Sequence, residues 1–257
     1  MAFDAVRFRA QSSETKPKLG RPLMYQPVTG STNDNALLAA RSGAPHGSLF
    51  VADEQTAGRG RRGNTWLAAP GESLLFSVLL RPKLELAQVS ALTLAIGLAL
   101  RDAIAPLVPG SVQIKWPNDL YVDGKKLAGV LVESQLQGDR LQAVVVGIGL
   151  NVATREFPEE IAARATSLAL LGAAHLDREA LLQELLNAIA LRVDAYQSTG
   201  VAGILDELNA ADALRGKRVR VDAQSGVGRG LDAQGRLLLE DESGVVHSFL
   251  SGTVELL

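Results

Sequence analysis

The chain has no cysteine, only three histidines among its 257 residues and almost no net charge. Without cysteine it has neither a disulfide framework nor a thiolate metal site. His46, His175 and His247 lie far apart, and none has a metal-binding spacing. The formal net charge is -2 and the pI is about 6.0, whereas a sequence-independent nucleic-acid binder usually shows a basic balance. DNA is therefore not an expected partner.

Long apolar runs are also missing. The longest, around Leu92–Leu100, is too short to span a bilayer, and the start "MAFDAVRFRA" lacks the apolar segment of a signal peptide. We expect a cytoplasmic protein with no membrane partner. The 47% hydrophobic content supplies ample core material, and the length suits one large domain with a smaller one.

Hydrophobic patterning predicts an α/β arrangement over most of the chain. The expected turn at Asp123-Gly124 makes residues 121–134 a hairpin. Ser31 and Asp177 are the expected N-caps of two helices. The helices are expected at 31–43, 86–104, 177–196 and 201–209, and the strands at 47–55, 73–82, 112–116 and 141–152.

The two ends differ from this middle part. Residues 1–22 are polar and predict a mobile or weakly ordered leader, too short for a helix-turn-helix. Beyond Leu214, turn signals at Ser225-Gly226, Gln234-Gly235 and Ser243-Gly244 predict a small all-β barrel. The expected division is thus a leader over 1–22, a large domain over 23–212 and a small domain over 213–257.

The stretch "GRGRRG", Gly58–Gly63, consists of glycine and arginine alone. Glycine lets backbone N–H groups point at one anion, and arginine adds a fixed charge whose planar fork fits carboxylate or phosphate. We expect a flap that is mobile in the empty protein and settles over an anionic ligand. The alternative is a solvated, arginine-rich turn. The pattern is not a P-loop, because Gly63 is followed by Asn64 and Thr65.

The segment "KWPNDLYVDGKKLAGVLVE" places Lys115, Asn118, Asp119 and Lys126 within twelve residues. Pairing through the Asp123-Gly124 turn would bring Asp119 close to Lys126. A carboxylate and an amine facing a pocket could serve a metal–nucleotide. A surface ion pair is the equally open alternative.

Two further motifs have ordinary structural explanations as well. "GIGLNV", Gly147–Val152, is not a dinucleotide fingerprint, since its third glycine is missing. Its glycines would let a ligand approach the backbone, or they belong to turns. In "STN", Ser31–Asn33, Ser31 or Thr32 could cap the helix and still face a polar ligand.

Together these motifs resemble those of biotin protein ligases. "STN", "EQTAGRGRRG" with Trp66, "KWPND", "KLAGVLVE" and "GIGLNV" occur in the family's order and spacing, and the tail "GVGRGLDAQGRLLLE" is similar to its C-terminal domain. The resemblance covers roughly residues 23–257. It implies an α/β (α+β) catalytic domain of the class II synthetase type on a mixed sheet, followed by an SH3-like barrel. Bifunctional members carry an N-terminal DNA-binding domain, for which 22 residues leave no room, so we expect the monofunctional type.

The resemblance also implies a reaction and its residues. Biotin and MgATP give biotinyl-5′-adenylate, and the biotinyl group passes to a lysine of a biotin carboxyl carrier domain of acetyl-CoA carboxylase or a related carboxylase; a homodimer is possible in this family. Lys126, Arg61 and Asp119 are the implied catalytic residues, with Asp119 also the candidate Mg²⁺ ligand. The implied biotin site is Ser31, Thr32, Asn33, Gln55, Arg59, Gly60, Arg61, Lys126, Gly129, Gly147 and Gly149. The implied ATP and phosphate contacts are Arg62, Trp66, Lys115, Asn118 and Asn151.

Three other functions stay open at this point. A lipoate or octanoate ligase would use the same two-step chemistry, although "GRGRRG" favours biotin. A nucleic-acid-binding regulator would use "GRGRR" and the basic "RGKRVRV", Arg215–Val221. A noncatalytic biotin-binding module would bind biotin without ATP-dependent pyrophosphate exchange.

Overall fold

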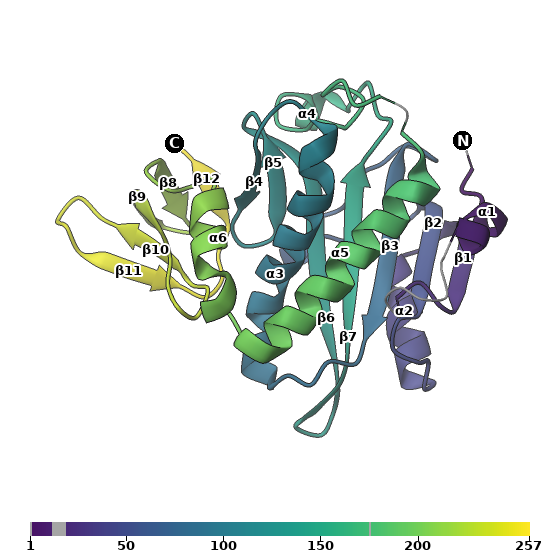
Figure 1. Cartoon of the computed structure of the whole chain (residues 1–257). Coiled ribbons are helices and arrows are strands. Elements are labelled where there is room, and N and C mark those ends of the chain that lie inside the picture. The colour runs from purple at the N-terminus through teal and green to yellow at the C-terminus, as the bar shows by residue number, and fades with distance from the viewer. Residues whose placement is uncertain (1, 12–18, 175) are drawn as a thin grey trace.

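The computed structural model describes residues 2–11, 19–174 and 176–257. A seven-stranded sheet in the order β1-β2-β3-β7-β6-β5-β4 forms the larger part of the protein (Figure 1). Only β1 and β2 pair in parallel; the remaining pairs are antiparallel, so the sheet is mixed as expected. Its strands are β1 (Leu23–Thr29), β2 (Leu49–Gln55), β3 (Ser73–Leu80), β4 (Val112–Lys115), β5 (Asp119–Val122), β6 (Lys125–Gln137) and β7 (Arg140–Asn151).

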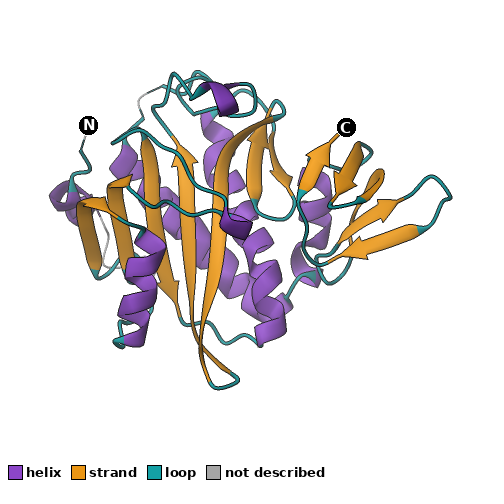
Figure 2. Ribbon diagram, turned by 180° about the vertical axis from the view of Figure 1, so that it is seen from behind, coloured by secondary structure: helices purple, strands orange, loops and turns teal. Residues whose placement is uncertain are grey.

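Two long helices cover one face of this sheet, α3 (Leu86–Ile104) and α5 (Arg178–Thr199) (Figure 1). All eight residues of β3 are buried, which is why its sequence is largely apolar, with Ser73 and Ser77 as the two polar exceptions. The segment Leu86–Leu107 is apolar and long enough to cross a membrane by composition, but 61% of its most apolar 18-residue window is buried inside the protein, as in a core helix. On the opposite face, α2 (Thr32–Arg41) and the loop after β2 cover the sheet only in part (Figure 2).

The smaller part of the protein is an all-antiparallel sheet in the order β11-β10-β9-β8-β12, consistent with an SH3-like barrel. It follows the short helix α6 (Leu205–Ala211) and is tied to the large sheet by Trp116, whose Nε1 donates to the Gly235 carbonyl at 3.1 Å. The domain boundary near residue 213 stays a prediction. The five strands are β8 (Arg218–Val221), β9 (Gln224–Leu231), β10 (Leu237–Glu240), β11 (Val246–Phe249) and β12 (Val254–Leu256).

Most predicted elements are present, and so is the Asp123-Gly124 turn. Both of its residues have positive φ, 50° and 77°, as a two-residue hairpin turn needs. Asp177 caps α5 by accepting from the Ala180 N–H. Ser31 occupies the N-cap position of α2, but its side chain makes no capping hydrogen bond, so that part of the prediction is wrong.

The predicted Ser225-Gly226 turn is also wrong, because both residues lie inside β9. The chain turns at residues 222–223 instead, with Asp222 at φ 50°. Gly226 is needed for close packing: a methyl group there would lie 2.9 Å from the Glu240 carbonyl carbon. The turns at Gly235 and Gly244 are confirmed by their positive φ.

The N-terminal segment is ordered where the structure describes it, which corrects the expectation of a weakly ordered leader. Helix α1 (Ala5–Gln11) packs against α5, and Phe3 and Phe8 are buried. The Phe3 N–H donates to the Asp53 carboxylate at 3.1 Å. Residues 12–18 of the predicted leader lie outside the described residues. Strand β1 was not predicted, since an edge strand containing Pro27 lacks regular alternation.

Candidate active site

A narrow cavity of about 130 Å³ opens on the face of the large sheet that α2 covers only in part. We call it the glycine cavity, after Gly129, Gly147 and Gly149 in its floor. Gly129 and Gly149 are direct partners across β6 and β7, so two bare backbone positions lie side by side. All eleven residues predicted for biotin line this cavity, together with Trp66, Asn118 and Asp119.

The glycines make room for particular side chains. A methyl group at Gly149 would lie 2.7 Å from Trp66 Cζ2, so the indole rests directly on the glycine floor. A methyl group at Gly147 would lie 2.7 Å from Asn33 Cγ. These contacts explain the motif "GIG" as a steric requirement of two site residues.

A chain of polar side chains closes the inner end of the glycine cavity. Gln55 Oε1 accepts from the Thr32 N–H at 2.7 Å and lies 3.0 Å from Thr32 Oγ1. The buried Ser77 Oγ lies 2.8 Å from Thr32 Oγ1 and donates to Asn33 Oδ1 at 2.5 Å. The Asn33 amide then donates to Glu133 Oε2 at 2.7 Å. Neither Ser77 nor Glu133 was predicted, because each is an ordinary strand residue whose role depends on the neighbouring elements.

At its other end the glycine cavity meets a second cavity of about 360 Å³. Both are lined by Asn64, Thr65, Trp66, Asp119 and Lys126. The second cavity adds the predicted Lys115 and Asn151, and also Tyr121, Phe157, Ile161 and Arg164. The last four were not predicted; the segment holding Arg164 carries no motif and reaches the site through backbone hydrogen bonds to Lys126.

Asp119 and Lys126 meet across the hairpin, as its turn predicts, with 2.8 Å between Oδ1 and Nζ. Lys126 Nζ also lies 5.3 Å from the centroid of the Trp66 ring. Burial lowers the pKa of Lys115, which nearby Asp119 partly offsets, and burial raises the pKa of Tyr121 to about 12. The Trp66 Nε1 is buried without a hydrogen-bond partner among the described residues, so the site has an unused donor.

The three loop arginines face three different surroundings. Arg59 forms a two-pronged ion pair with Glu133, at 3.0 and 2.7 Å, and also contacts Asp34 at 2.7 Å. Arg62, a predicted phosphate contact, lines neither of the two cavities; its guanidinium binds Asp222 Oδ1 at 2.7 Å and Thr253 Oγ1 at 3.1 Å, which lie just outside β8 and β12 of the small sheet. Carboxylate partners for two of these arginines were not expected from the sequence.

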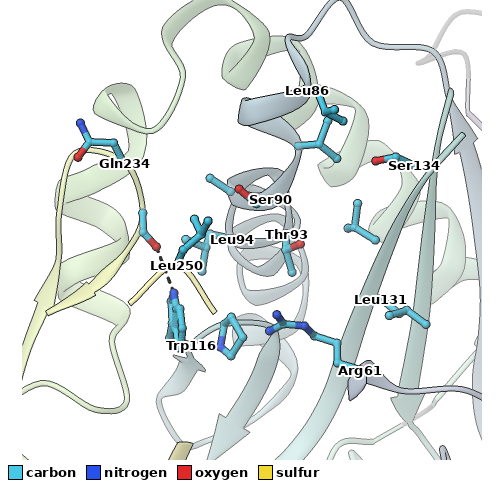
Figure 3. A pocket seen from close by; sticks show the side chains of 15 residues that line it. Arg61, Leu86, Ser90, Thr93, Leu94, Trp116, Leu131, Ser134, Gln234 and Leu250 are labelled. Atoms are coloured by element: carbon cyan, nitrogen blue, oxygen red, sulfur yellow. Dashed lines mark hydrogen bonds between the residues drawn. The ribbon is translucent and has the colours of Figure 1, made fainter. Parts of the chain in front are cut away.

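Arg61 extends toward a third cavity of about 340 Å³, between α3, β6 and the small sheet, on the side where Trp116 lies (Figure 3). It lines the glycine cavity as well. Arg61 forms no ion pair with a carboxylate among the described residues; burial lowers its pKa, neighbouring Arg62 adds to this, and the charge of Asp119 opposes it. Of the three loop arginines, Arg61 is therefore the one whose guanidinium is available to an anionic ligand.

The described side chains do not build a resident metal centre. The described residues contain no group of three or more His, Asp or Glu that could hold an ion. Asp119 offers one carboxylate, and its Oδ1 is already paired with Lys126. Mg²⁺ commonly binds through one or two carboxylates plus substrate phosphates, so the donor set fits an ion that arrives with a nucleotide.

Fold and site define a small-molecule-binding α/β domain with a polar cavity leading to a cationic one, joined to an all-β domain. The sequence profile of the Biotin/lipoate A/B protein ligase family matches residues 25–151, and that of the Biotin protein ligase C terminal domain matches residues 216–257. The Bifunctional ligase/repressor BirA of Bacillus spizizenii is 36% identical over 93% of this chain and 75% of its own length. The Biotin–[acetyl-CoA-carboxylase] ligase of Mycobacterium tuberculosis is 38% identical over 82% of this chain and 80% of its own.

The fold is similar to that of the biotin protein ligase from Aquifex aeolicus solved in complex with biotin and ATP. The TM-score is 0.80 and the identity 32%, over 93% of this chain and 100% of that one. The chain belongs to the biotin protein ligase family.

Proposed function

We propose that this chain is a biotin–[acetyl-CoA-carboxylase] ligase, which adenylates biotin with MgATP and transfers the biotinyl group to a lysine of a carboxyl carrier domain. The observation that carries the proposal is the junction of two cavities at Lys126 and Trp66. A carboxylic acid lying in the glycine cavity would present its carboxylate where a nucleotide in the second cavity presents its α-phosphate. The family and the relatives' names supply the two substrates.

The polar end of the glycine cavity favours biotin over lipoate. Asn33 Oδ1 has no proton and takes that of Ser77, so the Thr32 hydroxyl proton is left for Gln55 Oε1 or Ser77 Oγ. Oxygen lone pairs remain that a hydrogen-bond donor of the ligand can satisfy. The ureido ring of biotin carries two N–H donors, whereas a dithiolane or an alkyl chain carries none. Each unsatisfied buried group costs about 1–3 kcal/mol.

Adenylation needs no nucleophilic side chain, because an oxygen of the biotin carboxylate attacks the α-phosphorus itself. The bond from that phosphorus to the bridging oxygen breaks, and pyrophosphate leaves; Mg²⁺ arriving with the nucleotide would offset the negative charge of the phosphates. The repulsion between the two anions is the main obstacle, and positive charge aimed at the junction offsets it. Lys126 lies on the wall that both cavities share, and Lys115 lines the second one.

Transfer uses the same junction. The acceptor amine attacks the acyl carbon, AMP leaves, and the amine loses a proton. Asp119 is the carboxylate at the junction and the candidate to orient the incoming amine, although its pairing with Lys126 must loosen first. Asn118 lines the glycine cavity and Asn151 the second one, where both remain proposed nucleotide contacts. We place the reaction in residues 23–212, with residues 213–257 bordering it, in a cytoplasmic protein.

Pyrophosphate exchange with biotin, lipoate and octanoate in parallel tests the proposal. We expect exchange with biotin alone. Exchange with lipoate or octanoate but not biotin would assign the other branch of the family. Biotin binding without pyrophosphate exchange would indicate a noncatalytic biotin-binding module. Salt-resistant binding to specific DNA would favour a nucleic-acid-binding regulator.

A further inference from the structure

Glu133 ends the motif "KLAGVLVE" and contacts both the first turn of α2, at Asn33, and the glycine–arginine loop, at Arg59. Its Oε2 accepts from Asn33 Nδ2 at 2.7 Å, on the wall of the glycine cavity. Both its oxygens accept from Arg59, on the covering loop. We propose that Glu133 is a positioning residue that couples the filling of the polar end of the glycine cavity to closure of the loop. The inference rests on the proposed function.

The sheet register places Glu133 for this role. Gly129, Leu131 and Glu133 alternate along β6, so they share the face of the sheet that holds the cavity. Leu131 pairs with Gly147, whose missing side chain leaves the space that Asn33 occupies. The carboxylate therefore lies at the edge of the cavity, between the first turn of α2 and the loop.

The coupling requires that the orientation of the Glu133 carboxylate depends on Asn33 and in turn determines the contact with Arg59. The Asn33 side chain accepts from Ser77 on one side, and on the other its amide donates to Glu133 and, at the longer distance of 3.3 Å, to the Leu131 carbonyl. A ligand that hydrogen-bonds to the Thr32–Ser77–Asn33 chain holds the Asn33 amide in place, and so favours the carboxylate orientation that receives the planar fork of Arg59. An empty cavity lets Asn33 move, and the fork then loses one acceptor.

Asp34 provides a matched control. It also contacts Arg59, at 2.7 Å, but its side chain is 58% exposed and it does not line the glycine cavity. If Arg59 needs only a neighbouring negative charge, Asp34 and Glu133 are equivalent. If Glu133 couples the filling of the glycine cavity to loop closure, only substitution of Glu133 should abolish the effect of biotin on the loop.

The variants Glu133→Gln, Glu133→Asp and Asp34→Asn separate these cases. Glutamine keeps an acceptor for Asn33 but turns an N–H₂ group toward Arg59, so the fork is lost. Loop closure is measured by trypsin cleavage at Arg61 and Arg62, in the presence and absence of saturating biotin, with ATP absent from both samples. Cleavage at Arg59 is not counted, because the Glu133 variants change the contacts of Arg59 directly. Release of preformed biotinyl-adenylate reports the strength of the closed state.

In wild type and Asp34→Asn we expect biotin to slow cleavage strongly. In Glu133→Gln biotin should still bind but give little protection, and adenylate release should be about tenfold to a hundredfold faster, the effect of losing a charge-assisted hydrogen bond. Glu133→Asp keeps the charge on a shorter side chain and should recover part of the protection. If Glu133 only supported the fold, its substitution would instead lower the melting temperature of the unliganded protein and raise the KM for ATP.

Equal behaviour of Glu133→Gln and Asp34→Asn, in either direction, would overturn the coupling while leaving the proposed function intact. Failure of the wild-type chain to adenylate biotin would overturn both.

Discussion

Replacing Gly147 by alanine tests whether this glycine exists to admit Asn33. The added methyl group would lie 2.7 Å from Asn33 Cγ and 2.8 Å from Nδ2, and closer still to Oδ1. Carbon contacts normally lie near 3.5–4.0 Å, so the amide must move by roughly 1 Å. A shift of that size breaks its hydrogen bonds to Ser77 and Glu133, at 2.5 and 2.7 Å.

The magnitude follows from those two bonds. One is between neutral groups and one involves a carboxylate, so together they contribute about 2–4 kcal/mol. Alanine recovers about 0.5–1 kcal/mol, because glycine loses more conformational freedom in a strand. The free energy of unfolding should fall by about 1–3 kcal/mol, which lowers the melting temperature by about 2–12 °C in a protein of this size. Biotin should bind at least about tenfold more weakly, since the polar end of its cavity is displaced.

Thermal unfolding and calorimetric biotin titration measure the two effects. Gly30→Ala is the control, because a methyl group there meets nothing within 4 Å and Gly30 does not have positive φ. Its biotin affinity should match wild type, and its melting temperature should be unchanged or slightly higher, because alanine loses less conformational freedom on folding than glycine. A Gly147→Ala protein with unchanged melting temperature and affinity would refute the steric reasoning.

Four further predictions follow from the site. Lys126→Ala should slow adenylation by about a hundredfold to a thousandfold with a smaller loss of biotin affinity, because its charge acts mainly in the transition state; near-normal turnover would remove it from the mechanism. The Arg62–Asp222 ion pair joins the loop to the turn after β8, so Asp222→Asn should weaken loop closure and speed adenylate release. Equal release rates in Asp222→Asn and wild type would show that this ion pair does not hold the loop closed. Trypsin should cut the loop arginines more slowly with biotin plus ATP than without, and equal cutting would mean that the loop is no ligand-gated flap. Burial raises the pKa of all three tyrosines, Tyr25, Tyr121 and Tyr196, to about 12, so the folded protein should show no tyrosine absorbance step near pH 10. Because the unfolded chain binds fewer protons between pH 10 and 12, the free energy of unfolding should fall over that range. An absorbance step near pH 10 with the fold intact would contradict this prediction.

Local chemistry made much of this protein predictable. Asp123-Gly124 is a hairpin turn because both residues tolerate positive φ, and that turn alone brings Asp119 to Lys126. The apolar runs of β3 and β7 predict buried strands, and residues 73–80 and 143–148 are indeed buried. The glycine–arginine loop predicts an anion-facing segment, because the backbone freedom and the charge lie in the same six residues.

Other features depend on residues far apart in the chain, and only the tertiary structure decided them. Ser77, Glu133 and Arg164 belong to the site because β3, β6 and the segment after α4 (Glu159–Ala162) meet around α2 and Lys126. Arg62 was expected at a phosphate, yet it binds Asp222, 160 residues away. A sequence records which groups can form charged or hydrogen-bonded pairs, but many carboxylates could satisfy one arginine. The packing of buried apolar faces fixes which of them comes within 3 Å.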